Sequence, residues 1–157
     1  MSMELSLKAK DRVKEILARY PTRQAALLPA LWVAQEEWGW ISSEGMELIA
    51  KLLELPVSHV RGVASFYTMC NKRPVGKYHI QVCWNISCSL RGAESLICWI
   101  SKRLGIGLGE TTSDKKFTLS GVECLASCGT APAMQINDTY YENLTEEKVR
   151  QILDELV

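Results

Sequence analysis

The 157-residue chain lacks an excess of charge of either sign and lacks any long apolar run. Its 18 basic and 18 acidic side chains give a formal net charge of zero, which argues against general nucleic-acid binding. The longest apolar stretch, residues 25–34, contains Pro29 and is half as long as a membrane-spanning helix, which needs about 20 residues. Residues 1–11 mix charged side chains with leucines and contain no signal-peptide pattern. We therefore expect a cytoplasmic protein without direct membrane insertion.

A nucleotide-binding loop is missing as well. Gly105, Gly107 and Gly109 follow a predicted helix instead of a strand, and no helix follows them to receive a pyrophosphate. The chain also contains no G-x-x-x-x-G-K-[ST] segment. These absences predict that no nucleotide cofactor binds to this chain.

Helical periodicity dominates the first half of the chain. Apolar side chains recur at helical spacing in four segments: 13–20, 27–38, 46–53 and 57–64. Ser43 is the predicted N-cap of the third segment. Since no segment is long enough to be stable alone, the helices should pack on one another or on a partner. We predict a helical domain over residues 1–74.

The periodicity changes after the linker at residues 71–76. Strands are predicted at 77–82, 117–122, 133–136 and 139–141, and helices at 90–104 and after the cap Thr145. The order β-α-β-β-α implies one right-handed crossover, an antiparallel hairpin at Asn137-Asp138 and a covering helix. We predict an α/β fold in which an N-terminal helical bundle precedes a thioredoxin-like domain over residues 75–157.

The six cysteines carry the chemical information, because in a reducing compartment they indicate metal or redox chemistry instead of disulfides. Four of them form the pairs Cys83-x4-Cys88 and Cys124-x3-Cys128, and each pair follows a predicted strand. Neighbouring parallel strands end at the same edge of a sheet, so the two loops should converge. Four thiolates there could hold an iron–sulfur cluster or a tetrahedral zinc ion.

The composition of the two loops favours the iron–sulfur cluster. Zinc knuckles usually use the shorter C-x2-C turn, and these loops are rich in small or hydrogen-bonding residues: Asn85, Ser87, Ser89, Ser127, Gly129 and Thr130. Cys88 is expected just before a helix, whose dipole would stabilise its thiolate. A Rieske-type centre needs two histidine ligands, and neither His59 nor His79 lies near a cysteine pair in sequence.

The other residues of interest have structural interpretations. Cys98 is expected to be a small apolar core residue on its helix, and Cys70 is expected to have no part in the site. Trp32 is expected in the helical core. Pro132 is either a cis proline beside the site or an ordinary trans turn proline.

The flanks of the cysteines resemble a known family. The shared segments include FYTM at 66–69, PVGKYHI at 74–80, GETT at 109–112 and VECLASC at 122–128. With these segments the chain resembles the family of E subunits of bacterial NADH–quinone oxidoreductase (complex I). In this resemblance Cys83, Cys88, Cys124 and Cys128 match the four cluster ligands of the family. Two residues depart from the pattern: Ala126 replaces an expected glycine, and Cys70 stands where an aromatic residue is common. Trp84 is also bulky for a ligand loop.

The resemblance implies a thioredoxin-like [2Fe-2S] ferredoxin domain and an electron-transfer role in an NADH dehydrogenase module. FMN and NADH would bind to a partner flavoprotein subunit, and this chain would have no substrate site. The complex would hold the chain at the cytoplasmic face of the inner membrane. The alternatives are the equivalent diaphorase subunit of an NAD-linked hydrogenase or formate dehydrogenase, a thiol–disulfide oxidoreductase, and a zinc-stabilised adaptor. The thiol–disulfide reaction typically uses C-x-x-C at a helix start, whereas the first pair here has four intervening residues.

Overall fold

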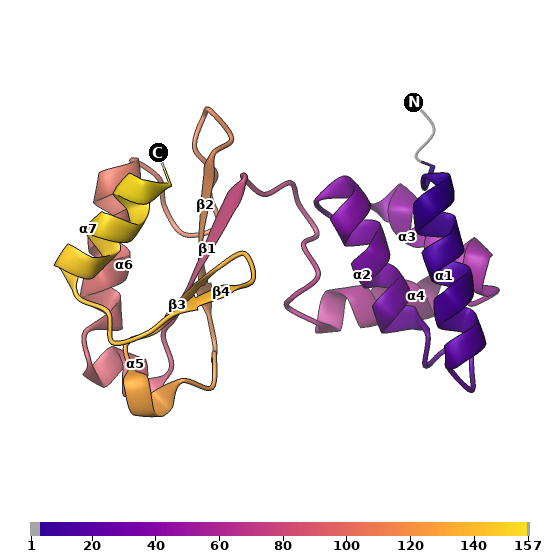
Figure 1. The fold of residues 1–157 in the computed structure, drawn as a ribbon, viewed down its shortest axis with the longest axis horizontal. Helices are drawn as coiled ribbons and strands as arrows, with labels where there is room; N and C mark the ends of the chain where they lie inside the picture. The colour runs from indigo at the N-terminus through magenta and orange to yellow at the C-terminus, as the bar shows by residue number, and fades with distance from the viewer. Residues whose placement is uncertain (1–3, 157) are drawn as a thin grey trace. The chain divides into compact units, whose positions relative to one another are not determined.

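A computed structural model describes residues 4–156 of the chain, which divides into two compact units, Met1–Pro74 and Val75–Val157. The first unit contains helices only, and the second combines a four-stranded sheet with helices (Figure 1). The predicted α/β class with an N-terminal helical bundle is therefore confirmed. Within residues 4–156, no helix is long and apolar enough to cross a membrane.

The first unit is built from four helices: α1 Leu7–Arg19, α2 Leu27–Trp38, α3 Ser43–Leu53 and α4 Val57–Phe66. Their apolar faces share one core that includes Leu31, Ile49 and Val60. Helix α3 is capped by Ser42 and not by Ser43, because the Ser42 hydroxyl accepts a hydrogen bond from the Gly45 N–H at 3.0 Å. The expectation for Trp32 was wrong, because this side chain is 38% exposed on α2.

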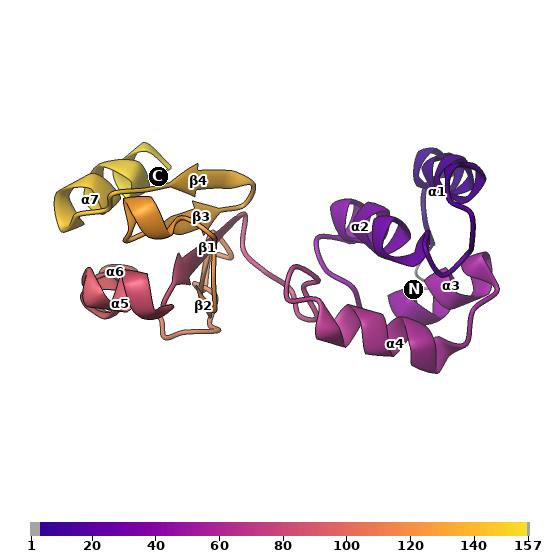
Figure 2. The ribbon, with the colours of Figure 1, turned by 90° about the horizontal axis from the view of Figure 1, so that it is seen from below.

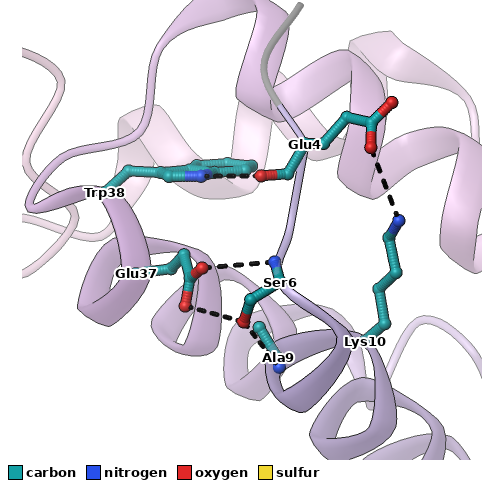
Figure 3. A network of polar contacts seen from close by, with 6 residues as sticks. All are labelled: Glu4, Ser6, Ala9, Lys10, Glu37 and Trp38. Atoms are coloured by element: carbon teal, nitrogen blue, oxygen red, sulfur yellow. Dashed lines mark hydrogen bonds and ion pairs between the residues drawn. The ribbon is translucent and has the colours of Figure 1, made fainter.

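The segment before α1 is held against the end of α2 by polar contacts (Figure 3). Ser6 caps α1 by accepting a hydrogen bond from the Ala9 N–H at 3.2 Å. The Glu37 carboxylate accepts from both the N–H and the hydroxyl of Ser6, each at 3.2 Å. The indole N–H of Trp38 donates to the Glu4 carbonyl at 3.4 Å. These contacts fix where the first helix begins.

The second unit runs through β1 Tyr78–Cys83, α5 Ile86–Leu90, α6 Ala93–Leu104, β2 Phe117–Val122, the 3-10 turn η1 Cys128–Thr130, β3 Met134–Ile136, β4 Thr139–Tyr141 and α7 Glu146–Glu155. The sheet order is β2-β1-β3-β4. Strands β1 and β2 are parallel, whereas β3 is antiparallel to both β1 and β4. This topology follows from one helical crossover and then a hairpin, as the sequence predicted.

One face of the sheet is covered by α6 and α7, which lie on the same side of it in both views (Figures 1 and 2). Alternation along the strands directs Ile80, Leu119 and Met134 into the core that these helices close. The predicted helix at 90–104 corresponds to α6, which starts three residues later, at Ala93, because Gly92 at φ 90° is its N-cap. The short helix α5, with Asn85 as its N-cap, precedes it and was not predicted.

Candidate metal centre

The two cysteine pairs lie at the end that the parallel strands β1 and β2 share. In the register of these strands Cys83, the last residue of β1, pairs with Val122, the last residue of β2. The chain after β2 therefore starts beside Cys83, whose thiol donates to the Glu123 carbonyl at 3.9 Å. Cys124 follows directly. The parallel pairing thus brings the two predicted ligand loops to one edge of the sheet.

The first cysteine loop, residues 83–88, turns directly from β1 into α5. The side-chain oxygen of Asn85 accepts a hydrogen bond from the Ile86 N–H at 2.8 Å and so caps the helix. Cys88 lies inside α5 and is 2% exposed. Cys88 precedes α6, the helix expected after it, but it lies within the additional short helix α5, which Asn85 caps.

Trp84, the bulky residue of the first loop, lies against Gly121 of β2. The Trp84 N–H donates to the Val122 carbonyl at 3.1 Å, which continues the strand pairing by one residue. A Cβ atom added to Gly121 would lie 2.5 Å from both Cε3 and Cζ3 of the Trp84 ring. The ring thus occupies the space that a larger residue at position 121 would need. The large side chain is accommodated because its neighbour is glycine.

The second cysteine loop, residues 124–128, turns sharply at its centre. The Ala126 N–H donates to Cys124 Sγ at 3.2 Å, the kind of contact that stabilises a thiolate ligand. Ala126 has φ 56°, in the left-handed region that favours glycine. The alanine therefore adopts a turn for which glycine is the easier residue. Beyond Cys128 and η1, the Ala131–Pro132 peptide is cis, which decides between the two expectations for Pro132.

The pKa of the Cys88 thiol depends on its burial and on two of the other three cysteines. Burial raises the pKa of Cys88, the Ala133 backbone lowers it, and the nearby Cys83 and Cys128 thiols raise it further. Cys124 is exposed. Across residues 4–156, no three His, Cys, Asp or Glu side chains are grouped closely enough to hold a metal ion. Among the described residues the structure thus brings the two loops to one edge of the sheet, with Cys83 and Cys88 buried and Cys124 and Cys128 exposed, but it does not close the four thiols into a metal-binding group.

The donor chemistry of this edge fits an iron–sulfur cluster. Thiolates are soft anionic ligands that favour iron–sulfur centres and zinc. Because burial keeps the Cys88 thiol protonated by raising its pKa, ligation there must release a proton. The backbone N–H already directed at Cys124 would accommodate the negative charge that thiolates and bridging sulfides carry.

The remaining cysteines and the sheet histidine lie outside this edge. Cys70 is buried in the core of the first unit. Cys98 is exposed, so its expected core position was wrong. The buried face of α6 carries Leu96 and Ile100, and position 98 falls on the opposite side of the helix. His79 Nε2 lies 2.8 Å from the Ser120 hydroxyl, within the sheet.

One residue at the site had no sequence signal. Glu142, which follows β4, accepts a hydrogen bond from the Thr130 hydroxyl at 2.6 Å. Thr130 and Ser127 were recognised as polar loop residues, but their acidic neighbour is twelve residues or more away along the chain. Neither a motif nor a periodic pattern connects Glu142 with the cysteines.

Comparison with known proteins identifies the family. A family model described as thioredoxin-like [2Fe-2S] ferredoxin matches residues 13–157. The chain belongs to the thioredoxin-like [2Fe-2S] ferredoxin family. This membership confirms the predicted thioredoxin-like domain and the predicted [2Fe-2S] cofactor.

Curated relatives of this ferredoxin cover most of its length. The E subunit of the NADH-quinone oxidoreductase of Rickettsia felis is 47% identical over 145 residues, which span 90% of this chain and 87% of the relative. The E 2 subunit of the Rhizobium meliloti enzyme is 41% identical, over 92% of this chain and 86% of the relative. The resemblance inferred from the cysteine flanks is therefore confirmed.

A solved structure shares the fold of this ferredoxin. A chain of an NAD+-reducing [NiFe]-hydrogenase in the air-oxidized state superposes with a TM-score of 0.72 at 21% identity. The match covers 83% of this chain but 22% of the hydrogenase chain. At this identity the likeness establishes the fold alone.

Proposed function

We propose that this ferredoxin is an electron-transfer subunit of an NADH–quinone oxidoreductase type complex, and that Cys83, Cys88, Cys124 and Cys128 ligate its [2Fe-2S] cluster. A bound cluster supplies one-electron chemistry. The observation that carries the ligand assignment is the parallel register of Cys83 with Val122, which starts both cysteine loops at one edge of the sheet. The relatives from Rickettsia felis and Rhizobium meliloti support the assignment to the complex.

The residues of this chain act by ligation, burial and hydrogen bonding. A cluster held by these cysteines would exchange single electrons with a flavin on the partner subunit, so this chain would form and break no bond of a substrate. Buried Cys83 and Cys88 exclude water from one side of the site, and the Ala126 N–H lies against Cys124 Sγ. Both effects change the relative stability of the oxidised and reduced states. The substrate site and FMN belong, in this proposal, to the flavoprotein subunit.

The ligand assignment is tested by matched cysteine variants of the full chain, purified and reconstituted without oxygen. Cys124→Ser should lose most of the iron, the acid-labile sulfide and the visible absorption. Cys98→Ser is the control, since Cys98 is exposed on α6 and lies outside both loops. An intact cluster in Cys124→Ser, or colourless wild-type protein that binds zinc, would refute the assignment.

An exposed apolar patch beside the cysteines is the proposed contact for the flavoprotein. Ile86 is 71% exposed and Leu90 80% exposed, four residues apart on α5. Leu90 also lines a pocket of about 340 Å³ together with Arg91 and Cys128. A single exposed apolar residue is common on protein surfaces, whereas a contiguous apolar patch marks a protein-binding surface. A flavin-bearing partner seated here would be next to a proposed cluster ligand.

The patch is tested by co-expression with the flavoprotein subunit from the same genome. Leu90→Glu should reduce the amount of flavoprotein that co-purifies by roughly tenfold, the effect of about 1.4 kcal/mol. Leu108→Glu is the control, because Leu108 is also exposed, at 44%, but lies in the loop after α6, whereas the patch precedes this helix. Equal recovery with both variants would place the interface elsewhere.

The hydrogenase likeness leaves a second assembly to be distinguished. A subunit of a hydrogenase complex would share this fold, so the proteins that co-purify with the chain distinguish the two assemblies. A thiol–disulfide reaction is disfavoured, because burial raises the pKa of Cys88, whereas an attacking cysteine needs a lowered pKa. Identification of the co-purified subunits separates the two assemblies.

A further inference from the structure

The turn that carries Cys128 is closed by Thr130. The Thr130 N–H donates to the Ser127 carbonyl at 3.1 Å, and the Thr130 hydroxyl lies 3.3 Å from the same oxygen. These contacts define the 3-10 turn η1, which begins at Cys128. The position of the Cys128 thiol therefore depends on where Thr130 is held.

Thr130 is held by a segment that is distant in sequence. Its hydroxyl donates to Glu142 Oε1 at 2.6 Å, and its carbonyl accepts from the Asn143 N–H at 2.7 Å. The Leu144 N–H adds a hydrogen bond to the Pro132 carbonyl at 3.1 Å. Residues 142–144 thus pair with residues 130–132, and Glu142 is the member of this pairing that acts through its side chain.

The Glu142 side chain also brings a negative charge to the turn. Hydrogen bonds from the Thr130 and Ser127 hydroxyls, in that order, and the nearby Lys148 lower the pKa of Glu142, so the group is a carboxylate at neutral pH. Lys148 donates its side-chain hydrogen bond to the Glu142 carbonyl. None of the salt bridges among the described residues involves Glu142. The charge therefore remains beside the turn that holds Cys128.

We propose that Glu142 is a positioning residue for the second cysteine loop, which it fixes through Thr130, and that its carboxylate lowers the reduction potential of the cluster. Reduction adds an electron to an already anionic centre, and a nearby negative charge opposes that addition. The inference rests on the ligand assignment proposed above. It differs from that assignment in predicting that a residue outside both cysteine pairs changes the potential.

The test is a redox titration of reconstituted full-length chains, followed by optical and EPR spectroscopy. Glu142→Gln removes the charge and retains the side-chain shape. We expect about a threefold higher ratio of reduced to oxidised cluster at a fixed potential, which is about 28 mV at about 59 mV per decade. Glu142→Ala should show the same rise and also lose its iron to a chelator several times faster, because the Thr130 contact is gone.

Two further variants separate positioning from charge. Thr130→Ala keeps the Glu142 carboxylate, so it should lose iron faster than wild type with a smaller rise in potential. Glu110→Gln is the charge control, since Glu110 accepts from the Gly107 N–H at 2.7 Å, in the loop after α6. It should match wild type in both measurements.

The outcomes distinguish this inference from the ligand assignment. If wild type holds a cluster and Glu142→Gln has the wild-type potential, the role of Glu142 is refuted. If Glu110→Gln raises the potential as much as Glu142→Gln does, the effect is one of overall charge and the specific role is refuted. If wild type assembles no cluster, the ligand assignment fails, and the Glu142 inference fails with it.

Discussion

The packing of Trp84 on Gly121 predicts a strong coupling between two residues beside the proposed cluster. Gly121→Ala would place Cβ 2.5 Å from two atoms of the Trp84 ring. If the ring stays, overpacking of this kind costs about 1–3 kcal/mol. If the ring swings away, it uncovers roughly 100 Å² of apolar surface, or about 2.5 kcal/mol at 25 cal/mol per Å². Both routes predict that Gly121→Ala lowers the free energy of unfolding by about 1–3 kcal/mol.

The effect of Gly121→Ala on the free energy of unfolding should disappear or reverse when Trp84 is absent. Gly121 does not have a positive φ, so alanine fits its backbone, and alanine is about 0.5–1 kcal/mol better than glycine within a strand. In a Trp84→Ala background, Gly121→Ala should therefore be neutral or slightly stabilising. The resulting coupling of about 1–4 kcal/mol is that of residues in direct contact, for which about 0.5–3 kcal/mol is usual.

Amide hydrogen exchange of the second unit measures this coupling. Ile80 of β1 and Leu119 of β2 are completely buried, so their protection reports the opening of the sheet. The cycle comprises wild type, the two single variants and the double variant, and iron retention is followed in parallel. The steric argument is refuted if Gly121→Ala costs the same free energy in both backgrounds.

Three further changes have predicted effects on stability, each measured by urea unfolding. Ala126→Gly should stabilise the chain by up to about 1 kcal/mol by relieving the left-handed conformation; a loss of stability would contradict this. Ser42→Ala should cost about 1 kcal/mol by removing the α3 cap, and Ser43→Ala, its control, should cost less. Burial lowers the pKa of His79 from its ordinary value of 6.5. The stability that neutral His79 contributes to the fold is therefore fully present above pH 6.5 and is lost as the pH falls below it. His79→Gln should flatten that dependence between about pH 7.5 and 5.5.

The features that the sequence predicted well are those whose signal is local. The periodicity of α2, with Gly39 at its left-handed C-cap, and the alternation along β1 each come from a single segment. The parallel crossover between β1 and β2 followed from the order of elements, and it brought the cysteine loops together. Cys98 was wrongly predicted to be buried because the residues on either side of it are apolar. Its position on the helix, opposite the buried Leu96 and Ile100, already indicated an exposed side chain.

The features that the sequence could not give are contacts between segments. The role of Gly121 can be recognised only when Trp84 is known to lie on it. The role of Glu142 can be recognised only when residues 142–144 are known to pair with the turn that carries Cys128. Neither relation leaves a spacing pattern along the chain. Cysteine spacing suggests which residues would ligate the cluster, whereas the reduction potential depends on hydrogen bonds and charges that the tertiary fold supplies. Two chains with identical cysteine loops should therefore differ in potential when the residue facing Thr130 differs in charge.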